Sequence, residues 1–292
     1  MSKQKKNAPV IAVINMKGGV GKTTISGNVF REAFRGHRIK TLLIDFDAQL
    51  NLTQLLLKRP DYEAVKTKKQ TLWHVFEPDP NVTVFETSES DVATVKSATK
   101  FTRRLKYLIG HQTVELHLLA GDFRVARLNL REKPETLRLP RLRFASLTSK
   151  AREEFDLVVL DCNPSSSFMT RCAIENCTHL LVPVKPDKYS VFGLELITEY
   201  LDGLPDLSSL PEIIVLMNGT SPALSREEAQ IRSHTKFGPA VMVKTIPQTK
   251  VLAARSDYTG FAVDRKVAYS KTTQRILAAV ARELLAKIGI LP

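Results

Sequence analysis

Two lysines, three glycines and two threonines within eight residues form the part of this sequence best suited to bind phosphate. The run Lys17-Gly18-Gly19-Val20-Gly21-Lys22-Thr23-Thr24 follows an apolar stretch at 10–14 and precedes an amphipathic one at 25–34. Glycines let backbone N–H groups converge on phosphate oxygens, and a following helix adds the positive end of its dipole. In such a loop Lys22 would pair with the β and γ phosphates, and the Thr23 hydroxyl would ligate Mg²⁺. The sequence therefore predicts a nucleotide-binding loop between a strand and a helix.

Three carboxylates follow two further apolar runs. Asp45 and Asp47 come after the run 41–44, and Asp161 comes after the run 157–160. A single acid at the end of a strand is often only a helix cap. However, the carboxyl ends of parallel strands meet at the crevice where ligands bind, so we expect all three carboxylates to lie near the phosphate loop.

These segments resemble three boxes of one family. Residues 17–24 match the deviant Walker A box K-G-G-x-G-K-[ST]-[ST] of the ParA and MinD superfamily at every fixed position, although Met16 replaces the first glycine of the general pattern. Residues 42–53 are similar to the Walker A′ segment hhhDxDPQGNxT, with Ala48 for Pro and Leu50 for Gly.

Residues 155–165 are similar to the Walker B stretch hhhhDxPP, with Asn163 for the first Pro. The three boxes have the order and spacing of the family. The sequence therefore resembles the ParA family of plasmid and chromosome partition ATPases over about residues 10–288.

The resemblance implies a role for each matching residue. Lys17 is the signature lysine, which reaches the partner's phosphates across an ATP-sandwiched dimer. Together with Lys22 and Asp47, which orients or activates the attacking water, it forms the predicted catalytic set. Thr23, Asp45 and Asp161 are the predicted Mg²⁺ residues. The predicted nucleotide-binding residues are Lys17, Gly18, Gly19, Val20, Gly21, Lys22, Thr23 and Thr24 of the loop, and Asn218, Pro247 and Gln248 around the adenine. Asn218 could alternatively be a turn residue.

Short apolar runs that alternate with helical stretches indicate the fold. Near-continuous runs fit strands buried on both faces, and their alternation with helices predicts an α/β fold with a mostly parallel sheet and helices on both faces, here a P-loop NTPase of the deviant Walker A type. We expect a basic tail at 1–9 and a single domain at 10–292. The region 59–110 predicts only peripheral helices and loops. The expected strands are 10–14, 41–44, 114–119, 157–160, 179–184, 212–217 and 241–244.

The charge of the chain predicts a polyanionic partner. The formal net charge is +13 and the pI is about 9.7. Residues 96–150 carry 13 Lys and Arg against 4 Asp and Glu, and residues 225–292 carry 12 against 5. Arg226, Arg232 and Lys236 match a region where family members contact DNA, whereas the expected helix 191–204 has no basic residue. Solvated helical faces are the alternative explanation of such charge.

The resemblance also implies a function. We expect an ATP hydrolase that uses ATP and Mg²⁺, forms a homodimer when ATP is bound, binds DNA non-specifically, and drives partition or positioning of plasmid or chromosome DNA with a ParB-like partner that stimulates hydrolysis. The alternative is a MinD-like or cargo-positioning switch on a membrane or a protein scaffold. We expect no membrane span and a cytoplasmic, nucleoid-associated protein. Because the phosphate loop begins near residue 15, we expect no N-terminal helix-turn-helix domain.

Overall fold

The computed structural model describes residues 7–79, 95–109, 111–131, 133–163, 165, 167–204, 207, 209–253 and 258–292. Its strands form one sheet in the order β3-β4-β2-β5-β1-β6-β7-β8, in which the β3–β4 pair is antiparallel and every other pair is parallel. The strands are β1 (Val10–Val13), β2 (Thr41–Asp45), β3 (Arg103–Ile109), β4 (Gln112–Leu119), β5 (Leu157–Asp161), β6 (His179–Val184), β7 (Glu212–Thr220) and β8 (Ile246–Pro247).

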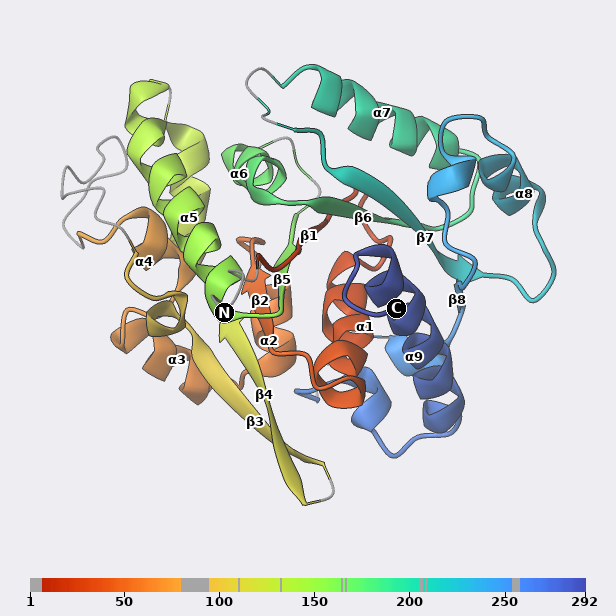
Figure 1. Cartoon of the computed structure of the whole chain (residues 1–292), viewed down its shortest axis with the longest axis horizontal. Coiled ribbons are helices and arrows are strands. Elements are labelled where there is room, and N and C mark those ends of the chain that lie inside the picture. Colours follow the sequence, from red (N-terminus) through yellow and green to blue (C-terminus); the bar gives the residue numbers. More distant parts are fainter. Residues whose placement is uncertain are drawn as a thin grey trace, which may run out of the picture.

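Helices cover both faces of this sheet (Figure 1). The α-helices are α1 (Lys22–Gly36), α2 (Asn51–Leu56), α3 (Arg59–Thr67), α4 (Leu72–Phe76), α5 (Glu135–Glu154), α6 (Phe168–Asn176), α7 (Ser190–Asp202), α8 (Arg226–Arg232) and α9 (Ser270–Lys287). Short 3₁₀ helices are η1 (Ala98–Phe101), η2 (Phe123–Leu130), η3 (Gly238–Ala240), η4 (Lys250–Leu252) and η5 (Ala262–Asp264).

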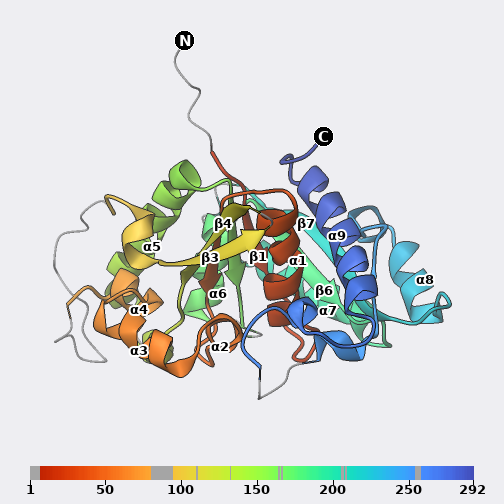
Figure 2. The same ribbon diagram turned by 90° about the horizontal axis from the view of Figure 1, so that it is seen from below.

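Each face of the sheet has its own apolar core. Along β1, Val10 and Ala12 join the core under α4 to α8, whereas Ile11 and Val13 join the core under α1, α2, α3 and α9. This alternation follows the two-residue period of a strand whose two faces are both covered. α9 packs beside α1 (Figures 1 and 2). The predicted α/β fold is confirmed.

Apolar residues at helical spacing in the last segment of the chain are buried against the body, since α9 buries Leu277, Val280 and Leu284. Of the predicted basic tail, residues 1–6 lie outside the described residues. Ala8 is buried and exchanges two hydrogen bonds with Arg152, from Ala8 N to Arg152 O at 3.0 Å and from Arg152 Nε to Ala8 O at 2.9 Å.

Two strand predictions were wrong. The run 241–244 makes only an isolated bridge at Val241, and the strand lies at 246–247. The N–H groups of Val243 and Lys244 donate instead to the Glu283 carboxylate, each at 2.7 Å, so they pair with α9 and not with a strand. The second error is β3, which lies in the region where only helices and loops were expected.

Candidate functional site

The phosphate loop joins β1 to α1 at the carboxyl edge of the sheet, meaning the edge where its parallel strands end. Gly19 has φ +73° and Gly21 has φ +90°, values that suit glycine. A Cβ at Gly21 would lie 2.5 Å from Asn218 Nδ2. Asn15 fixes the start of the loop, because its Nδ2 donates to Pro183 O at 2.7 Å and its Oδ1 accepts from Lys17 N at 2.8 Å. The loop is therefore preshaped by its own glycines and by β6.

Lys22 opens α1 and turns back into this loop. Its Nζ donates to Asn15 O at 3.0 Å and to Lys17 O at 3.1 Å. Burial lowers the pKa of Lys22, whereas Asp161 and, more weakly, Asp47 oppose that shift. The ammonium is thus held among loop carbonyls and the carboxylates of the carboxyl edge, where a phosphate bound by the loop would meet it.

Asp161 ends β5 and lies opposite Asp45, the last residue of β2. Its Oδ1 accepts from Ser26 Oγ at 2.7 Å, while its Oδ2 is buried without a hydrogen-bond partner. Burial raises the pKa of Asp161 to about 6. A buried carboxylate oxygen of this kind needs a cation or a donor to complete it, so the site fits a metal ion that takes its other ligands from phosphate and water.

Asp45 has a different environment. It is fully buried, and its Oδ2 accepts from Thr53 N at 2.8 Å and from Thr53 Oγ1 at 2.6 Å. Its Oδ1 accepts from Asp47 N at 3.2 Å. Burial and, secondly, Asp161 raise the pKa of Asp45 to about 7. Both oxygens are therefore engaged in shaping the loop from β2 to α2, and the geometry favours Asp161 over Asp45 as a direct metal ligand.

Asp47 lies inside this β2–α2 loop. Its Oδ1 accepts from Gln49 N and its Oδ2 from Asn51 Nδ2, both at 2.9 Å. These bonds orient the carboxylate without involving the metal residues. A cavity of about 850 Å³ opens beside the same loop and the first turn of α1.

Lys17 points across the loop towards the turn between β6 and α7. Its Nζ forms an ion pair with Asp187 and lies 5.9 Å from the centre of the Tyr189 ring. Burial raises the pKa of Asp187, but the Lys17 ammonium outweighs this effect and holds that pKa below its ordinary value.

The predicted adenine residues lie on adjacent strands. Asn218 on β7 pairs with Ile246 on β8, and Thr220 pairs with Pro247. Asn218 Nδ2 donates to Val20 O at 2.8 Å, so this amide contacts the phosphate loop. Gln248 is exposed beyond β8, and its N donates to Thr220 O at 3.0 Å. Their contact with adenine stays a prediction.

The three predicted DNA residues differ in their surroundings. Arg226 and Lys236 are exposed. Arg232 donates from Nε to Glu228 Oε1 at 3.0 Å and from Nη1 to Met242 O at 3.1 Å, which ties α8 to the segment before β8. The prediction of a DNA contact therefore rests on the two exposed residues.

Sequence reasoning missed the residues that hold the predicted ones in place. Ser26, one turn after Thr23 in α1, bonds Asp161, and Asp187 pairs with Lys17. Neither belongs to a predicted motif. A search for hydroxyls on the same helix face as Thr23 would have found Ser26, because residues three apart are neighbours there.

The comparisons with known proteins identify the family of this chain. The model of a family described as an AAA domain matches residues 8–209. The chromosome-partitioning ATPase Soj of Thermus thermophilus is 30% identical over 251 residues, which cover 83% of this chain and 82% of that protein. A ParA family protein of Chlamydia trachomatis is 27% identical over 195 residues, 66% of this chain and 65% of the relative, so the chain spans about two thirds of that relative's length.

Solved structures share the fold. A plasmid partition protein from Borrelia burgdorferi B31 bound to AMPPNP has a TM-score of 0.67 at 16% identity, covering 97% of this chain and 100% of that one. The pNOB8 ParA bound to nonspecific DNA has a TM-score of 0.65 at 15% identity, covering 96% and 98%. The family match over residues 8–209 and the similarity to Soj decide the relationship. This chain belongs to the ParA/Soj family of partition ATPases.

Proposed function

We propose that this chain hydrolyses ATP, dimerises when ATP is bound, binds DNA non-specifically as a dimer, and returns to a weakly binding monomer after hydrolysis. The observation that carries the ATP part is the buried, unpartnered Oδ2 of Asp161 beside the phosphate loop. Mg²⁺ keeps several waters and usually takes only one or two protein carboxylates, so it suits this arrangement. A solved structure of the same fold is bound to AMPPNP.

The residues of the loop would divide the chemistry among them. Backbone N–H groups of the loop and Lys22 bind the phosphates, and Thr23 with Asp161 holds Mg²⁺, which neutralises phosphate charge when bound. Asp47 orients the attacking water, whose oxygen bonds the γ phosphorus as the bond to the β-phosphate oxygen breaks, giving ADP and phosphate. Lys17 offsets charge on the nucleotide of the neighbouring subunit.

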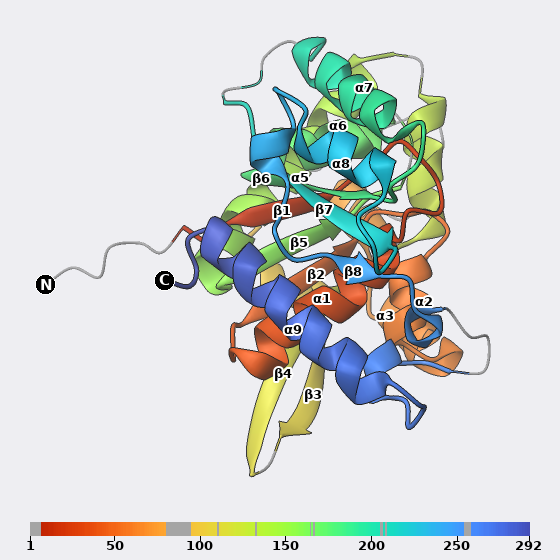
Figure 3. The same ribbon diagram turned by 90° about the vertical axis from the view of Figure 1, so that its right-hand side faces the viewer.

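The DNA part is supported by exposed cations around β8. On α9, Lys271, Arg275 and Arg282 are exposed, and we call them the α9 basic stripe. At 100° per residue they lie within about 40° of one another around the helix. None of the three forms an ion pair with the part of the chain that the structure describes. Figure 3 shows α8, β8 and α9 on one side of the molecule, and the exposed Arg226 is the first residue of α8.

Dimerisation would link ATP binding to DNA binding. A dimer presents two copies of this basic surface on one frame, so the second copy binds DNA at high effective concentration and affinity rises without a new contact. The pNOB8 ParA structure contains nonspecific DNA. We expect a cytoplasmic, nucleoid-associated protein whose hydrolysis is stimulated by a ParB-like partner. Among the described residues, no helix is both long and apolar enough to span a bilayer.

The test is retention on random duplex DNA with ATP, ADP and no nucleotide, in parallel with anionic liposomes. We expect retention on DNA with ATP alone. Equal retention in all three conditions would refute the switch, and ATP-dependent retention on liposomes but not on DNA would replace it by the MinD-like alternative.

Two variants separate binding from turnover in the same assay. Lys22→Ala should abolish nucleotide binding and DNA retention, because it removes the phosphate partner. Lys17→Ala should keep ATP binding and lose hydrolysis, because its proposed target is the neighbouring nucleotide. Full ATPase activity in Lys17→Ala would exclude that role.

A further inference from the structure

The ion pair between Lys17 and Asp187 joins two segments that are 170 residues apart in sequence. Lys17 lies in the loop after β1, and Asp187 lies in the turn between β6 and α7. β1 and β6 are neighbours in the sheet, so both segments meet at the carboxyl edge. The side chains are 40% and 33% exposed, which leaves the pair within reach of a second molecule.

Hydrogen bonds within the turn orient Asp187 independently of Lys17. Asp187 Oδ1 accepts from Tyr189 N at 2.9 Å, and Asp187 N donates to Ser190 Oγ at 2.8 Å. The Ser190 hydroxyl in turn donates to Lys185 O at 2.7 Å. These bonds fix the carboxylate and direct its Oδ2 to the Lys17 ammonium.

The backbone of Lys17 is fixed as well. Its N donates to Asn15 Oδ1 at 2.8 Å, and its O accepts from Lys22 Nζ at 3.1 Å. Asn15 is itself bonded to Pro183 on β6. Because hydrogen bonds hold both backbones, rotation of the long Lys17 side chain is enough to open the ion pair.

We propose that Asp187 is a positioning residue that holds Lys17 inside its own subunit, and that this pair opens when the ATP-bound dimer forms. The inference rests on the proposed role of Lys17 at the neighbouring nucleotide. One ammonium cannot pair with its own Asp187 and also reach the partner's phosphates, so dimerisation must break the ion pair. The free energy of the ion pair therefore favours the monomer. Exposed ion pairs are weak, so Asp187 sets the nucleotide threshold of dimerisation and does not block it.

The first test needs no dimer. The rate of Lys17 acetylation by an amine-reactive reagent is measured by peptide mass spectrometry on the nucleotide-free full chain. Asp187→Asn should raise this rate about two- to five-fold, the range open to an exposed pair. The variant keeps an Oδ1 acceptor for Tyr189 N, so the turn is retained. Asp202→Asn, which removes an exposed acid at the end of α7, is the matched control and should leave the rate unchanged.

The second test titrates AMPPNP against dimerisation, followed by light scattering. The nucleotide concentration at half dimerisation should fall about two- to five-fold in Asp187→Asn and stay constant in Asp202→Asn. A wild type that never dimerises would refute the proposed function, while the labelling result would still report on the pair. Unchanged labelling in Asp187→Asn, or a threshold that stays equal or rises in a dimerising protein, would overturn the proposal.

Discussion

At the scale of single residues, the three carboxylates of the carboxyl edge are separated by their hydrogen bonds. Both carboxylate oxygens of Asp45 accept hydrogen bonds, from Thr53 and from Asp47 N. Those of Asp47 accept from Gln49 N and Asn51 Nδ2. Asp161 alone keeps a buried oxygen without a partner. Removal of Asp45 would therefore disturb the loop itself, whereas Asp47 can be removed with the metal residues left intact.

Replacing Asp47 should stop hydrolysis without preventing ATP binding. Asp47→Ala removes the group proposed to orient water, so we expect phosphate release to slow by at least about 100-fold and the ATP-bound dimer to accumulate. Phosphate release and light scattering at saturating ATP are the measurements. Asn51→Ala is the control, because it removes a donor to Asp47 and keeps the carboxylate. A monomeric Asp47→Ala protein at saturating ATP would contradict the assignment.

His74 should make stability depend on pH. Its Nδ1 lies 2.9 Å from Thr71 Oγ1, and its Nε2 faces Arg124 Nη2 at 3.5 Å. Burial, and secondly Arg124, lower the pKa of His74 to about 4 from 6.5. His74 therefore binds a proton more readily in the unfolded chain than in the folded one. The stability that the folded protein gains from keeping His74 neutral is fully present above pH 6.5 and is lost as pH falls towards 4.

We expect the free energy of unfolding to fall by about 1.5 kcal/mol more in the wild type than in His74→Gln between pH 6.5 and 5, since the slope rises to about 1.4 kcal/mol per pH unit once the unfolded imidazole is protonated. Urea unfolding at the two pH values measures the difference. If the free energy of unfolding depends on pH equally in the two proteins, His74 is not the group that titrates.

At the scale of elements, the sequence identified the strands that are buried along their whole length and missed the half-exposed β3. β1, β2 and β5 are buried along their whole length, so continuous apolar runs mark them. β3 alternates instead, with Arg104, Lys106 and Leu108 exposed and Leu105 less so. Its two-residue period was the available signal, and its charged residues obscured it.

The residues of the candidate site also fall into those that the sequence could predict and those that it could not. Its loops follow motifs, so the lysines and carboxylates could be predicted from the sequence. Asp187 acts through a contact between distant segments, which no local pattern encodes, whereas Ser26 could have been found from its position on the helix face of Thr23. Leu50, which stands where the family has Gly, adopts φ +64°, so the loop keeps the left-handed turn at a backbone cost of about 1–2 kcal/mol.

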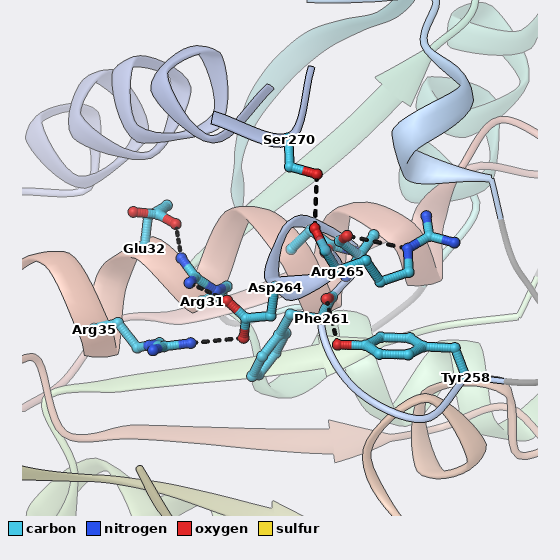
Figure 4. A network of polar contacts seen from close by, with 10 residues as sticks. Arg31, Glu32, Arg35, Tyr258, Phe261, Asp264, Arg265 and Ser270 are labelled. Carbon is cyan, nitrogen blue, oxygen red and sulfur yellow. Dashed lines mark hydrogen bonds and ion pairs between the residues drawn. The ribbon is translucent and has the colours of Figure 1, made fainter. Parts of the chain in front are cut away.

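α1 and α9 should be coupled through Asp264, which precedes α9. Arg31, with a side chain only 5% exposed, pairs with Glu32 and Asp264, and Arg35 Nη1 lies 2.6 Å from Asp264 Oδ2 (Figure 4). Asp264→Ala leaves the buried Arg31 with one partner fewer, so we expect a loss of about 2–3 kcal/mol in urea unfolding. Arg35→Ala, which keeps the Arg31 pair, should lose less than about 1 kcal/mol. Equal losses would show that burial of Arg31 is not the cause.

At the scale of the whole molecule, counts of charge along the sequence misplace part of the basic surface. Of the cations in 96–150, Arg131 and Arg143 are buried and pair with the buried carboxylate of Glu77. They hold the segment after η2 and helix α5 to Glu77 at the end of α4, and they cannot reach DNA. The cations of 225–292 include the exposed α9 basic stripe but also the buried Arg265, so burial, which the sequence does not show, removes cations from both predicted DNA surfaces.

Removing the α9 basic stripe should therefore change how DNA binding depends on salt. Each cation that neutralises a phosphate releases counterion, and each lost contact lowers the slope of log affinity against log salt by about 1. We expect Arg275→Ala combined with Arg282→Ala to lower the slope by about 2 with ATP. Lys287→Ala is the control, because Lys287 is exposed on the same helix but lies about 140° around it from Arg282. The measurement is ATP-dependent retention on random duplex DNA across a salt series, with nucleotide binding checked in each variant. If the double variant keeps the wild-type slope, or if Lys287→Ala lowers it equally, DNA does not bind along this face of α9.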